Sequence, residues 1–144
     1  LTLKIIEKKI DLDEARKYLK TLRKHSISAK LLLILGLPGE SENIVQEMLD
    51  FIDETEPKSV QVSLFTPFPG SDMTDNHQKY GIKSVSTDFE DFHITSQRFE
   101  ADEKLNIFYE YDEVTPWGKG KKQEQILAEY EQMQAILRER ELIF

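Results

Sequence analysis

The 144-residue sequence contains no cysteine. Disulfide bonds, zinc–thiolate sites and iron–sulfur ligation by this chain are therefore excluded. It also lacks a long hydrophobic run, since no apolar stretch approaches the ~20 residues that a membrane-spanning helix requires. Nothing at its start resembles a signal peptide, so a cytoplasmic setting is expected.

Positive charge is scarce as well. The 19 Lys and Arg residues stand against 27 Asp and Glu residues, which gives a net charge of −8 at pH 7. Such a surface repels a phosphate backbone, so no nucleic-acid partner is expected. The 39% hydrophobic content suffices for a modest core of one domain or part of one. The chain opens in an amphipathic pattern without a starting Met, which we interpret as a piece of a larger protein.

The most informative stretch is the apolar run 31–35 with the turn that follows it. Five apolar residues in a row predict a strand of a parallel sheet, buried on both faces. The turn at 36–40 contains two glycines and a proline, and Ser41 is placed to cap a helix over 42–56. Ligands of parallel α/β folds gather at the carboxyl ends of strands, so this turn is the first candidate for a site.

The neighbouring segments repeat the same kind of unit. Asp11 is placed to cap a helix that runs to about His25. Alternating apolar residues predict a second strand over 59–65, and a loop with two prolines follows at 66–71. A short helix over 72–80 ends at a glycine.

This order of helix, strand, helix and strand predicts an α/β fold, with a partial (half) parallel β/α barrel over 1–81. Residues 82–144 are expected to form an irregular α+β tail with short strands, the best candidate being 107–111, and a long terminal helix over about 121–142. One face of that helix is apolar: Ile126, Tyr130, Met133 and Leu137. The aromatic residues of the tail are expected to pack onto the first half: Phe89, Phe92, Phe99, Phe108, Tyr109 and Tyr111.

Single motifs carry little chemistry. A phosphate-binding loop needs a Lys after its last glycine, but Glu40 stands there and would repel a phosphate. Without a ligand the same residues make a tight turn between strand and helix. The three histidines, His25, His77 and His93, lie in separate segments without metal-ligand spacing. No catalytic residue and no metal ligand is therefore assigned.

Two segments together are more specific. Residues 33–41 read Leu-Ile-Leu-Gly-Leu-Pro-Gly-Glu-Ser, and residues 66–71 read Thr-Pro-Phe-Pro-Gly-Ser. This pair resembles the radical SAM superfamily, and more narrowly its cobalamin-associated branch, with the anaerobic magnesium-protoporphyrin IX monomethyl ester cyclases and many methyltransferases. The segment 6–15 also resembles the one that follows the fourth barrel strand there. The resemblance covers residues 1 to about 81.

The resemblance implies the carboxyl-terminal half of a radical SAM barrel plus a tail. The full-length enzyme would cleave AdoMet reductively at a four-iron (4Fe-4S) cluster, and cobalamin would be a further cofactor in that branch. The reaction would be methyl transfer or oxidative cyclisation of a tetrapyrrole. The cluster-binding CxxxCxxC loop would lie upstream of Leu1, so this chain would hold no cofactor of its own and would be inert alone.

The resemblance also implies a wall of the cofactor site, built from seven positions: Lys8, Leu32, Ile34, Gly36, Phe65, Thr66 and Pro67. By position in the family, Ile34 packs against adenine, Gly36 lets the backbone approach the cofactor, and Lys8 reaches the AdoMet carboxylate. Phe65, Thr66 and Pro67 border adenine and substrate. Leu32 stands where a polar residue often meets the ribose.

The expected partners are the remainder of the same polypeptide and a small-molecule substrate. Because half a barrel leaves strand edges unpaired, a homodimer of the isolated chain is expected too. The alternative is a free-standing acidic α/β binding module that pairs with a partner through its last helix. A third reading is another barrel enzyme with a phosphate-bearing substrate.

Overall fold

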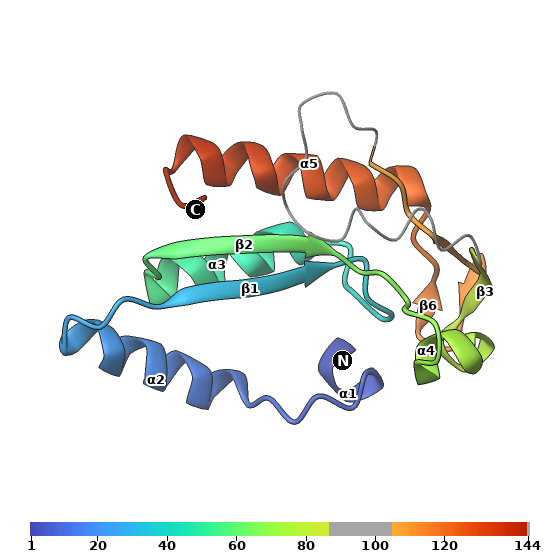
Figure 1. The fold of residues 1–144 in the computed structure, drawn as a ribbon, viewed down its shortest axis with the longest axis horizontal. Helices are drawn as coiled ribbons and strands as arrows, with labels where there is room; N and C mark the ends of the chain where they lie inside the picture. Colours follow the sequence, from blue (N-terminus) through green and yellow to red (C-terminus); the bar gives the residue numbers. More distant parts are fainter. Residues whose placement is uncertain (87–104, 144) are drawn as a thin grey trace.

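The structure is a computed structural model that describes residues 1–86 and 105–143, so the predicted packing of Phe89, Phe92 and Phe99 lies outside the described part. It is a mixed α/β fold (Figure 1). The helices are α1 (Thr2–Ile5), α2 (Leu12–Lys24), α3 (Ile44–Thr55), α4 (Asp72–Asp75), the 3-10 helix η1 (His77–Tyr80) and α5 (Gln123–Glu139). The strands are β1 (Lys30–Leu35), β2 (Ser59–Leu64), β3 (Ile82–Val85), β4 (Tyr109–Tyr111), β5 (Val114–Thr115) and β6 (Gly118–Lys119). The described strands form two-stranded sheets, and none of these sheets closes on itself.

The central unit is β1, α3 and β2. The two strands are parallel, and their register runs from Lys30 opposite Ser59 to Leu35 opposite Leu64. α3 connects them and lies behind them, while α5 runs along the β2 side and α2 along the β1 side (Figure 1). This is the strand–helix–strand unit that the apolar run and its turn predicted.

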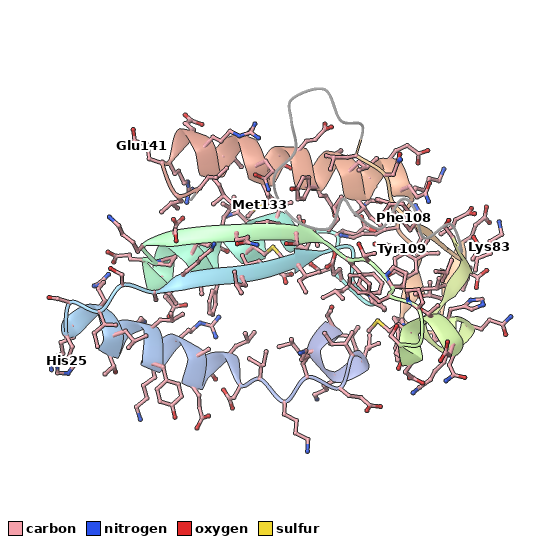
Figure 2. The ribbon with its side chains drawn as sticks, viewed as in Figure 1. His25, Lys83, Phe108, Tyr109, Met133 and Glu141 are labelled. Carbon is pink, nitrogen blue, oxygen red and sulfur yellow. The ribbon has the colours of Figure 1, made fainter. Side chains whose placement is uncertain are left out.

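The main core lies between these strands and the helices α3 and α5. Leu35 and Val62 are fully buried there, together with side chains of both helices. The apolar stripe predicted for the terminal helix is confirmed, because Ile126, Met133 and Leu137 are fully buried and Tyr130 is nearly so. Figure 2 shows Met133 on the side of α5 that faces the strands. This apolar face of α5 therefore packs against other elements of the same chain.

The carboxyl-terminal residues also cover the outer edge of β2. The Val60 amide donates to the Leu142 carbonyl oxygen at 2.8 Å, and Ile143 forms a parallel bridge with Val60. The Gln134 side chain donates to the Val62 carbonyl oxygen at 3.3 Å. These bonds satisfy backbone groups that an edge strand otherwise leaves unpaired.

The prediction that β1 is buried on both faces is wrong, because the face that does not contact the main core is exposed. Leu32 is 69% exposed and Ile34 is 45% exposed. The parallel register directs the N–H and C=O groups of these two residues away from β2, toward an edge that no described strand covers. The run is apolar on both faces, but the described part of the chain buries only one of them.

A second core joins the tail to the carboxyl ends of the strands. β3 pairs antiparallel with β4. β4 falls within the predicted strand 107–111, whereas the sequence analysis did not identify β3 as a strand. The buried side chains of this cluster come from five separate segments: Ile5, Tyr80, Ile82, Tyr109 and Ile126. The tail therefore contributes to both cores.

Helix ends test the capping predictions. The Asp11 carboxylate accepts the amides of Asp13 at 2.8 Å and Glu14 at 3.0 Å, so its capping role is confirmed. The prediction for Ser41 is wrong, because α3 begins at Ile44 and the residue before it is Asn43. The Ser41 hydroxyl instead accepts the Asn43 amide at 3.1 Å, within the turn that leads to the helix. No helix among the described residues has the length and apolar character needed to cross a bilayer.

Candidate functional site

The candidate site is the shared carboxyl end of β1 and β2. The Phe65 amide donates to the Leu35 carbonyl oxygen at 2.7 Å, so β1 and β2 end at the same level of the sheet. The turn 36–40 follows β1 there, and the side chain of Ile5 from α1 lies against Gly39. Two strand ends and the amino-terminal helix thus meet at this turn.

The turn is closed by the side chain of Glu40. One carboxylate oxygen accepts the Gly36 amide at 3.0 Å, and the other accepts the Leu37 amide at 2.9 Å. The Glu40 side chain is only 2% exposed. Because both amides are already bound to a carboxylate, they are not available to a phosphate group. Glu40, whose position argued against a phosphate-binding loop in the sequence, therefore occupies the amides that such a loop would offer to a phosphate.

A buried lysine connects Glu40 to the tail. The Lys121 ammonium lies 3.6 Å from a Glu40 oxygen and donates to both oxygens of Glu129, at 2.9 and 2.8 Å. The Lys121 side chain is 6% exposed and that of Glu129 is 12% exposed. When all three groups are ionised, two carboxylates share one ammonium, and the cluster carries one excess negative charge.

This environment changes the acidity of Glu40. Burial raises the pKa of the Glu40 carboxyl to about 7, against the lowering effects of the two amides and Lys121, and Glu129 raises it further. An ordinary Glu in the unfolded chain titrates near 4.5. The contribution of Glu40 to stability is therefore fully present below that value, and it is lost as the pH rises through about 7.

Two tyrosines of β4 complete the site. The hydroxyls of Tyr109 and Tyr111 both donate to the Gly36 carbonyl oxygen, at 2.6 and 2.8 Å. Alternate residues of a strand lie on one face, which is why this pair converges on one acceptor. Burial raises the pKa of both phenols above the usual value, so both remain protonated donors. Figure 2 shows Tyr109 beyond the carboxyl ends of the two strands.

The structure explains why position 36 is a glycine. Its φ of +91° lies in the left-handed region, which disfavours residues with a Cβ. A Cβ built on Gly36 would also overlap the Tyr109 hydroxyl and would lie 3.1 Å from Ile126. The close approach that glycine permits here is made by the protein's own tyrosine. A contact between Gly36 and a cofactor stays a prediction.

The other sequence-predicted positions lie on β1, just after β2 and just after α1. Ile34 and Leu32 point from β1 to the exposed face, with Leu32 further from the turn. Phe65, Thr66 and Pro67 continue from β2, Pro67 is fully buried, and the Phe65 ring lies 5.0 Å from that of Tyr109. Lys8 is exposed, just after α1.

The sequence interpretation did not find the residues that hold the turn. Tyr109, Tyr111, Lys121 and Glu129 were assigned no role at this site, and Glu40 served only as an argument against a phosphate. One signal was present, since a carboxylate in a short turn between an apolar strand and an amphipathic helix needs partners if it is buried. Nothing local identifies those partners, because Gly36 and Tyr109 are 73 residues apart.

The described residues contain no group of three His, Cys, Asp or Glu side chains arranged to hold a metal ion. No family model, curated protein or solved structure matches this chain. Its candidate site is therefore characterised by its own geometry.

We expect Gly36→Ala to destabilise the protein by about 3 kcal/mol or more, since it combines left-handed strain with overlap on Tyr109. Gly70→Ala is the matched control, because Gly70 has a φ of +76° and open space where its Cβ would lie. It should cost about 1–2 kcal/mol. Urea denaturation measures both values, and equal losses would contradict a steric role for Tyr109.

Lys121→Met should destabilise the protein by about 3–5 kcal/mol, because it leaves two buried carboxylates without their ammonium. Lys122→Met changes the same residue type at the next, exposed position and should cost less than about 0.5 kcal/mol. Both are measured by urea denaturation at pH 8, where Glu40 is largely ionised. A small loss for Lys121→Met would mean that the ammonium does not compensate these charges.

Proposed function

We propose that this chain is the carboxyl-terminal half of a radical SAM barrel with its tail, from an enzyme of the cobalamin-associated branch. Its role is to supply the apolar wall of the site where AdoMet and substrate bind. The four-iron cluster and its cysteines belong to the preceding part of the polypeptide. The chain alone is inert and holds no cofactor.

The observation that carries this proposal is the bare apolar face of β1. In a β/α barrel the helices cover the outer face of each strand, and the inner face lines the interior. Here α3 and α5 cover the face of Leu35 and Val62, while Leu32 and Ile34 are left exposed on the other. Exposed aliphatic side chains on a parallel strand call for a covering element, and the missing barrel strands would provide it.

The chemistry of that face suits an adenine ring. Adenine needs a flat apolar slot with few polar contacts, and Ile34 lies opposite Ser63, one residue before the end of β1 and the turn. Radical intermediates need a dry cavity, and an aliphatic wall supports that. The alternative of partner binding through the last helix finds no exposed stripe, since Met133 and Leu137 are buried.

The proposal is tested on the full-length protein, produced from its complete reading frame and reconstituted anaerobically with iron and sulfide. A visible absorption band of a four-iron cluster and reductive cleavage of AdoMet to methionine and 5′-deoxyadenosine are the expected results. A reading frame without an upstream CxxxCxxC, or a protein that takes up no iron, would rule the proposal out.

In that holoenzyme, Ile34→Ala should weaken AdoMet binding roughly tenfold, because three carbon atoms of the adenine wall are lost. The matched control is Val114→Ala, which truncates a side chain that is 83% exposed in the β5–β6 hairpin. Equilibrium binding of AdoMet is measured for both, with circular dichroism to confirm folding. An unchanged affinity in folded Ile34→Ala would remove this residue from the site.

The isolated 144-residue chain should form a homodimer through the same bare face. Leu32→Glu and Ile34→Glu place charges on that face and should convert the dimer to a monomer, whereas Val114→Glu should leave it intact. Sedimentation equilibrium over a range of concentrations gives the masses. A wild-type chain that stays monomeric at its highest soluble concentration would contradict this expectation.

A further inference from the structure

The three buried ionisable groups at the strand end do not have a balanced net charge. When ionised, Glu40, Lys121 and Glu129 together carry a net charge of −1. Their side chains are only 2%, 6% and 12% exposed, respectively. Isolated charges are expensive to bury, so such a cluster is stable only if it is neutralised. The simplest neutral form of this cluster holds one additional proton.

The surroundings offer no second cation among the described residues that contact the cluster. β4 contributes the neutral hydroxyls of Tyr109 and Tyr111, which donate to the Gly36 carbonyl oxygen. α5 contributes Gln125, which donates to Glu129 at 3.2 Å and to Glu42 at 2.9 Å. α1 contributes the apolar Ile5 beside Gly39. The proton balance of the site therefore depends on the two carboxylates and Lys121.

We propose that Glu40, Lys121 and Glu129 form a proton-controlled latch, which holds the turn 36–40 against the start of α5 while the cluster contains one extra proton. When that proton leaves, the excess charge favours a state in which Glu40 moves into solvent. The turn then separates from Lys121 and loses its two bonds to the Glu40 carboxylate. This inference does not depend on the proposed function.

Thermodynamic linkage gives the direction. The closed turn holds the proton more tightly than an open turn, in which Glu40 is an ordinary solvated carboxyl. Raising the pH therefore favours opening, and the raised pKa of Glu40 places the change near neutral pH. Because Ile34 lies just before the turn, this equilibrium would also control how well ordered the end of β1 is.

Amide hydrogen exchange followed by NMR on the 144-residue chain tests the latch between pH 5 and pH 8.5. After correction for the intrinsic exchange rate, the Gly36 and Leu37 amides should exchange at least tenfold faster at the upper end, with a midpoint near pH 7. The Met133 amide, in the buried core of α5, should show no matching step. A flat profile at Gly36 and Leu37, or an equal step at Met133, would overturn the proposal.

Two variants assign the step to the cluster. Glu129→Gln removes the excess charge and keeps the side-chain shape, which lowers the pKa of Glu40 in the closed turn. The step should therefore become smaller and move below pH 7, or disappear. Glu124→Gln is the matched control, since it makes the same change on an exposed position of the first turn of α5. A step that is unchanged in Glu129→Gln, or equally altered in Glu124→Gln, would also overturn the latch. The wild-type titration remains decisive if Glu129→Gln does not fold.

Discussion

The burial of the Glu40 carboxylate is the constraint on which the strand end depends. Its two oxygens satisfy the amides of Gly36 and Leu37, which an irregular turn would otherwise leave without acceptors. Desolvation of a carboxylate costs several kcal/mol, and a carboxylate with a single nearby ammonium recovers this only with good geometry. Lys121 stands 3.6 Å away and is shared with Glu129, so the recovery is incomplete. A turn that is held in this way is ordered, yet it responds to protonation.

The same constraint explains why the tail cannot be treated as an appendage. α5 fills the main core with Met133 and Leu137, and the segment just before it provides Lys121. β4 provides the two hydroxyls that bind the Gly36 carbonyl oxygen. The division of the chain near residue 81 follows the change in sequence character, but the packing crosses that division in both cores.

Local patterns predicted the elements well where a single physical rule acts. The i, i+4, i+7 spacing of Ile126, Tyr130 and Met133 identified the buried side of the last helix, and Gly81 ends η1 in a left-handed conformation as expected. The rule failed at Ser41, because the turn after Glu40 is longer than the spacing suggested. It also failed on the exposed side of β1, since an apolar side chain shows what should be buried but not whether the chain supplies the cover.

Contacts between distant segments form the rest of the site, and no periodicity encodes them. Tyr109 and Tyr111 resemble any strand pair until their shared acceptor is known, and Lys121 resembles any lysine at the start of an acidic helix. Once they are placed, the glycine turn has two different sides. Toward Tyr109 and Ile126 it is packed too closely to accept a Cβ, so nothing can bind there without moving the tail. Toward Ile34 it borders the exposed face of β1, where an apolar ligand or a further strand can lie without displacing a described core residue.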